Sequence, residues 1–158
     1  MTTKSDFTPV EWATLRQAPP DAAAYIIVAD PSILSTFVEI RLVNKALNVP
    51  SAPPAAEELV EALAADLEAG EASDTGTQAV DESEDLQQRL LDTVRGAAAV
   101  VDAKCATAEA EGFKQWLLDL ARVAAYAHKE GGILGIGGVP VSEKEKAALA
   151  ELESALGL

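Results

Sequence analysis

Cysteine and histidine are almost absent from this chain of 158 residues, which holds one of each. One thiol cannot form a disulfide framework, and one cysteine with one histidine cannot supply the ligands of a zinc or iron–sulfur site. Aromatic residues are also scarce, at 4% of the chain. Because β-sheets favour aromatic and β-branched side chains, whereas the abundant alanine and leucine favour helices, this composition predicts an all-α fold.

Long apolar segments and positive charge are in short supply too. The longest uninterrupted apolar run covers residues 22–29, far short of the roughly 20 residues that cross a bilayer. Residues 1–7 have no apolar stretch typical of a secretory signal. The 12 Lys and Arg residues face 26 Asp and Glu residues, for a net charge of −14, and such a field repels phosphate backbones and anionic lipids. We therefore expect no nucleic-acid partner, no membrane partner and a cytoplasmic location.

Capping signals mark where the helices begin. Thr8 and Glu11 have the spacing of a capping box, and Phe7 and Trp12 have that of a hydrophobic staple, which together predict a helix over about 9–17. A second capping box, Ser142–Glu145, predicts the start of the last helix.

Proline and glycine mark where the helices should end. The pair Pro19–Pro20 is expected to end the first helix and to allow a restart over about 20–29, and Gly70 should end a later one. The whole chain, 1–158, is predicted to be one helical domain, a bundle of four long and about three short helices, in which the acidic stretch at about 70–82 is a flexible linker. The five helices after the first two are expected at about 31–47, 54–69, 83–106, 108–130 and 143–157.

The cysteine and the histidine each have a simple structural explanation. Cys105 lies on an apolar helical face, which predicts core packing, and His128 lies in the last turn of its helix, where an imidazolium meets the negative end of the helix dipole. An acid–base site of His128 with Asp119 would need a second chain, because the two residues lie on different helix faces. Asp119 and Arg122 have the spacing of a surface ion pair. They lie on a polar strip of the helix, and the alternative interpretation of this strip is a binding face.

The glycine-rich segment at 131–140, GGILGIGGVP, separates the last two helices. It does not match a phosphate-binding loop, because it has neither a Gly-Lys-Ser/Thr ending nor a preceding strand. Its large apolar residues either pack the segment onto the core or form a docking patch for a partner. No complete catalytic set occurs in the chain, so we expect a non-enzymatic interaction or accessory module without a cofactor, which binds a protein partner or forms a homo-oligomer. The predicted partner-binding residues are Ile133, Leu134, Ile136 and Val139.

Two segments carry a resemblance to a known family. The ending VSEKEKAALAELESALGL and the stretch AYIIVADPSILSTFVE resemble the acidic helix turns of tellurite-resistance TerB-like domains. The resemblance implies a compact helical domain in which two acidic turns hold a divalent cation in a stress response. The matching positions are Asp30 and Glu39 in the first turn and Glu145 in the second. A cation-binding stress-response domain is therefore the alternative function.

Overall fold

The computed structural model describes residues 2–29, 52–71, 84–127 and 141–158. These ranges contain no β-strand, so the predicted all-α fold class is confirmed for this part of the chain. Within them, one short 3-10 helix, η1 (Lys4–Asp6), precedes five α-helices, which are α1 (Pro9–Ala29), α3 (Glu57–Glu71), α4 (Glu84–Lys104), α5 (Thr107–Ala127) and α6 (Glu143–Leu156).

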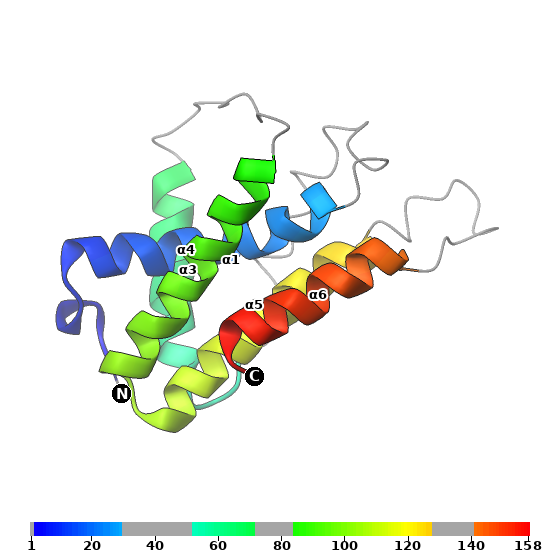
Figure 1. The fold of residues 1–158 in the computed structure, drawn as a ribbon. Coiled ribbons are helices and arrows are strands. Elements are labelled where there is room, and N and C mark those ends of the chain that lie inside the picture. Colours follow the sequence, from blue (N-terminus) through cyan, green and yellow to red (C-terminus); the bar gives the residue numbers. More distant parts are fainter. Residues whose placement is uncertain (1, 30–51, 72–83, 128–140) are drawn as a thin grey trace.

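Helix α1 is the element that joins the others. It packs against α3, α4, α5 and α6, and α5 and α6 lie side by side (Figure 1). The buried apolar side chains of all five helices form one continuous core. None of the described helices combines the length and the apolarity that crossing a membrane requires. The largest fully buried side chains include Leu15, Tyr25, Leu63, Val94, Phe113 and Leu152.

The start of α1 follows the predicted capping signals. The Thr8 amide donates to Glu11 Oε2 at 2.7 Å, and the Glu11 amide donates to Thr8 Oγ1 at 3.3 Å. These hydrogen bonds from Thr8 lower the pKa of Glu11. The rings of Phe7 and Trp12 lie 5.7 Å apart, as the staple requires. The capping box and the staple are therefore confirmed.

The predicted break between two short helices is wrong. Helix α1 runs without interruption from Pro9 to Ala29, with Pro19 and Pro20 inside it. Two prolines remove two backbone donors and crowd the carbonyls four residues earlier, a cost that normally ends a helix. Here Leu15 and Ala18 before the pair and Ala22 after it are completely buried in the same core. Burial on both sides of the pair outweighs the local preference of proline.

Helix α3 is held to the beginning of α1 by one carboxylate. Asp66 accepts hydrogen bonds from Lys4 Nζ at 2.6 Å and from Trp12 Nε1 at 2.7 Å, and these contacts lower its pKa. The sequence predicts that Gly70 ends this helix, but α3 includes Gly70 and extends to Glu71. One glycine inside a helix costs only about 1 kcal/mol, which does not force an end.

The other helix boundaries lie within a few residues of the predicted ones. Helices α4 and α5 match the expected helices at about 83–106 and 108–130 up to residue 127, and α6 matches the last one. Gly157 ends α6 in the left-handed region at φ 71°, where glycine is the favoured residue. The expected helix at 31–47 and residues 72–82 of the expected linker lie outside the described residues.

Two of the glycines inside helices, Gly96 and Gly112, predict opposite responses to alanine. A methyl group at Gly96 would lie 3.4 Å from Thr14 Cγ2, an ordinary contact, whereas one at Gly112 would lie 3.0 Å from the Ala56 methyl group. We expect Gly96→Ala to raise the free energy of unfolding by about 0.5–1 kcal/mol, the helix-propensity gain. Gly112→Ala should lose this gain to steric strain. Urea unfolding of both variants checks the expectation, and an equal gain in the two would contradict the close contact of Gly112 with Ala56.

Candidate functional site

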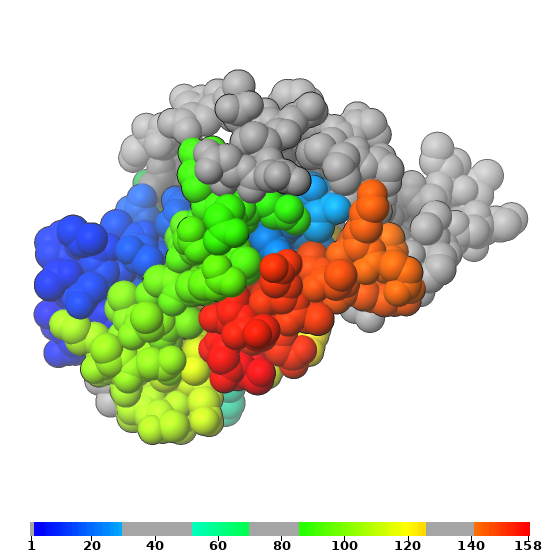
Figure 2. Space-filling model, viewed as in Figure 1, coloured from blue at the N-terminus to red at the C-terminus, as the bar shows by residue number. Residues whose placement is uncertain are grey.

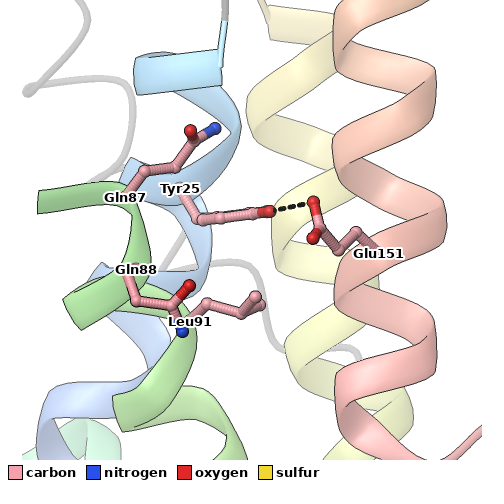
Figure 3. Close-up of a pocket in the computed structure, with 5 residues that line it drawn as sticks. All are labelled: Tyr25, Gln87, Gln88, Leu91 and Glu151. Carbon is pink, nitrogen blue, oxygen red and sulfur yellow. Dashed lines mark hydrogen bonds between the residues drawn. The ribbon is translucent and has the colours of Figure 1, made fainter. Parts of the chain in front are cut away.

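A pocket of about 220 Å³ opens to solvent between α1, α4 and α6. In the space-filling view, the end of α1 shows at the surface between α4 and α6 (Figure 2). The accessible lining of the pocket is mainly polar, and two of its residues, Tyr25 and Leu91, are only 2% exposed. Its lining residues are Tyr25, Gln87, Gln88, Leu91 and Glu151 (Figure 3).

The central feature of the pocket is a hydrogen bond between Tyr25 of α1 and Glu151 of α6. Tyr25 Oη donates to Glu151 Oε2 at 2.6 Å, the short distance typical of a hydroxyl bound to a carboxylate (Figure 3). Burial of the phenol raises the pKa of Tyr25 far above its usual value, and the hydrogen bond and charge of Glu151 raise it further. The phenol therefore keeps its proton at physiological pH, so the pair is better suited to binding than to proton transfer.

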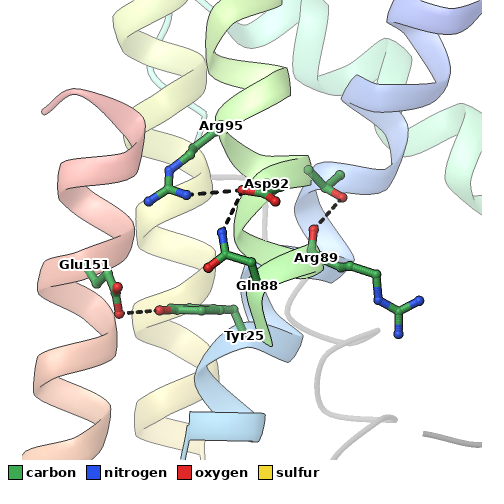
Figure 4. Close-up of polar contacts among 7 residues, drawn as sticks. Tyr25, Gln88, Arg89, Asp92, Arg95 and Glu151 are labelled. Carbon is green, nitrogen blue, oxygen red and sulfur yellow. Dashed lines mark hydrogen bonds and ion pairs between the residues drawn. The ribbon is translucent and has the colours of Figure 1, made fainter. Parts of the chain in front are cut away.

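Helix α4 supplies the opposite wall through a small polar network. Gln88 Nε2 donates to Asp92 Oδ1 at 2.9 Å, and the same oxygen accepts from the Arg95 guanidinium at 3.2 Å (Figure 4). With the amide nitrogen turned toward Asp92, the carbonyl oxygen of Gln88 lies on the side of Tyr25 (Figures 3 and 4). The wall of α4 therefore presents a hydrogen-bond acceptor to the pocket.

Asp21 lies one helical turn before Tyr25 on α1 and is buried. Burial raises its pKa, while hydrogen bonds from Gln17 and Thr93 partly oppose the rise. Gln17 Nε2 donates to Asp21 Oδ1 at 2.7 Å. Because Thr93 belongs to α4, this carboxylate contributes to the contact between α1 and α4 rather than to the lining of the pocket.

The predicted divalent-cation site has one described member. Glu145 is 4% exposed, and its Oε2 accepts the Ser142 amide at 2.7 Å as the second half of the α6 capping box. This role in the cap explains the residue without a metal ion. Asp30 and Glu39 lie outside the described residues, within which no three Asp, Glu, His or Cys side chains are placed to hold a metal ion. The cation site therefore stays a prediction.

The predicted partner-binding residues also lie beyond the described part of the chain. This applies to Ile133, Leu134, Ile136 and Val139, and likewise to His128. Their predicted roles therefore stay predictions.

Cys105 and the predicted ion pair are both described. Cys105 is partly buried against the core, as expected, and burial raises the pKa of its thiol, which makes the thiolate less available. The Arg122 guanidinium donates to Asp119 at 3.0 Å, which confirms the surface ion pair.

The Tyr25 pocket has no clear signal in the sequence. Tyr25 lies inside the apolar run 22–29, a pattern typical of a core residue. Glu151 is one of 26 acidic residues, so its presence alone does not indicate a site. The two are 126 residues apart, so no local spacing connects them. Comparison with known proteins gives no further indication of a site, since no family model, curated protein or solved structure matches this chain.

Proposed function

We propose that this protein is a non-enzymatic helical interaction module that docks a protein partner through the apolar segment 131–140. The observation that carries the proposal is the length of the connection between α5, which ends at Ala127, and α6, which begins at Glu143. The two helices lie side by side, and neighbouring helices of this kind are usually joined by about 2–8 residues. The described ends of these two helices are separated by roughly 15 residues, 128–142, and long connections are either functional or linkers.

The helices on both sides of the segment are firmly held. Ala148, Leu152 and Leu156 of α6 are buried in the core, and the Ser142–Glu145 box caps its first turn. Trp116 and Leu117 hold α5 in the same way. Fixed ends reduce the conformational entropy that a segment loses when it binds, which supports a role in recognition.

The composition of the segment supports an apolar contact with a partner. Four of its ten residues are the predicted partner-binding residues, and the others are glycines and one proline. Burying each large apolar side chain in a protein interface contributes about 1.5–3 kcal/mol. Four such residues can form the apolar centre of an interface, which polar contacts then surround.

The double variant Ile133→Asp/Ile136→Asp tests the proposed docking segment. Two carboxylates in an apolar contact leave unpaired charge there, so we expect the yield of a cross-linked partner to fall at least tenfold. Quantitative mass spectrometry of complexes captured from the native cells gives this yield, and light scattering reports loss of self-association if the partner is a second copy.

Val10→Asp is the matched control, because Val10 is 76% exposed on α1 and an acidic residue is compatible with the first turn of a helix. The control should keep the captured partner, and circular dichroism should show helical spectra for both proteins. Unchanged capture and unchanged mass in the folded double variant would contradict the proposal.

A further inference from the structure

We infer that the pocket between α1, α4 and α6 binds an alkylammonium group, with Glu151 as its charged partner. This inference goes beyond the docking segment and does not depend on it. It stands on the chemistry of the pocket lining, on the pairing of Arg95 with Asp92 and on the charge of the chain.

Among the described residues, the lining offers hydrogen-bond acceptors and one negative charge but no cation. Glu151 is exposed at the mouth of the pocket, and among the described residues only Tyr25 donates to its carboxylate. Its Oε1 is therefore available to an incoming donor, as is the carbonyl oxygen of Gln88 on the facing wall (Figure 3). An ammonium group has three N–H donors and no acceptor, which matches this arrangement.

Arg95, whose charge acts on Tyr25, is paired with a carboxylate. Arg95 donates to Asp92 at 3.2 Å on α4, and neither residue lines the pocket (Figure 4). Glu151 is therefore the charged group among the described residues of the lining. The net charge of −14 further raises the local concentration of cations around the chain.

The charge of Glu151, rather than the walls, accounts for most of the attraction of the cation. Tyr25 and Leu91 line the pocket, but each is only 2% exposed, so they offer a small contact area to methylene groups. A volume of about 220 Å³ corresponds to roughly seven water molecules at their share of liquid volume, enough for a short aliphatic amine. A divalent metal ion fits poorly, because Ca²⁺ and Mg²⁺ need about six oxygen ligands and the described part of the lining has a single carboxylate.

Titration of the ¹⁵N-labelled full chain with n-butylammonium chloride tests the inference by NMR. We expect saturable shifts of the amide signals of Tyr25, Gln88, Leu91 and Glu151. The neutral analogue n-butanol, at the same concentrations, should leave these signals almost unchanged, because it lacks the charge that Glu151 binds.

Two lining variants locate the charged and neutral contacts. Glu151→Gln should weaken n-butylammonium binding at least about tenfold, since it removes a charge-assisted hydrogen bond. Gln88→Leu should weaken it about threefold through loss of a neutral acceptor. Both residues are exposed, so both variants should fold.

Glu143→Gln is the matched control for general attraction to an acidic protein. Glu143 is on the same helix as Glu151, its side chain is 89% exposed, and it pairs with Lys146 outside the pocket. The control should keep its affinity for n-butylammonium within about twofold. Equal affinities of the Glu151→Gln and Glu143→Gln variants, or equal shifts with n-butanol, would overturn the inference.

Two further ligands distinguish the sources of the ammonium group. Tighter binding of spermidine than of n-butylammonium indicates a free polyamine, and tighter binding of the peptide acetyl-Gly-Lys-Gly-amide indicates a lysine side chain of a protein. The Ile133→Asp/Ile136→Asp variant should bind n-butylammonium as the unmodified chain does. Failure of the docking segment and failure of the pocket are therefore separate outcomes.

Discussion

Replacing Phe113 with alanine is expected to lower the free energy of unfolding by about 3–5 kcal/mol, the range for a fully buried phenylalanine. Phe113 is 0% exposed in the middle of the core, and its ring lies 5.9 Å from that of Trp116. The side chains of a close-packed core relax only partly into the space that a removed ring leaves, so a cavity remains. Since domains are usually stable by only 5–15 kcal/mol, the variant should lose a large part of its stability.

Urea unfolding followed by circular dichroism measures this loss. Phe113→Leu keeps most of the volume, so it should cost about 1 kcal/mol. Val123→Ala is the surface control, because Val123 is 38% exposed on the same helix, and it should change the stability by less than about 0.5 kcal/mol. If Phe113→Ala cost no more than Val123→Ala, the packing of α5 at the centre of the core would be wrong.

The helix signals that were predicted correctly all depend on neighbouring residues. The box of Thr8 with Glu11 and that of Ser142 with Glu145 each join residues three positions apart, and both form as expected. Hydrogen-bonding groups this close in the chain meet whenever the helix starts there, whatever packs around it. Local chemistry was therefore enough to locate both helix starts.

The pocket could not be predicted in this way. Its two central residues, Tyr25 and Glu151, are brought together by the packing of α6 against α1, which no periodicity in either segment specifies. Gln87, Gln88 and Leu91 come from a third helix, α4. A site made from single residues of three helices depends on the tertiary structure, so the sequence shows only that each residue is present.

In helix α1, a local signal predicts a helix end that the structure does not have. Consecutive prolines predict a helix end, yet α1 continues through Pro19 and Pro20. Proline disfavours a helix interior by about 3 kcal/mol relative to alanine. The core contacts of α1 with α4, α5 and α6 provide the free energy that offsets this cost.

Replacing Pro20 with alanine should therefore stabilise the protein by about 2 kcal/mol. Alanine restores an amide that can donate to the Arg16 carbonyl, and it removes the clash of the proline ring with that carbonyl. Part of the gain of about 3 kcal/mol is lost, because alanine makes the unfolded chain more flexible. Pro20 is only half-buried, so little packing is lost. The melting temperature should rise by roughly 4–8 °C for a domain of this size.

Pro54→Ala is the matched control for the α1 variant. Pro54 is exposed in the turn before α3, where proline fits the backbone, so its replacement should destabilise by about 0.5 kcal/mol through the unfolded state. The opposite signs of the two changes separate a helix interior from a turn. If α1 were instead two helices with a break at the prolines, Pro20 would stand at a favourable first helical position. Both replacements would then lower the melting temperature, so the sign of the Pro20→Ala shift decides between one continuous helix and two.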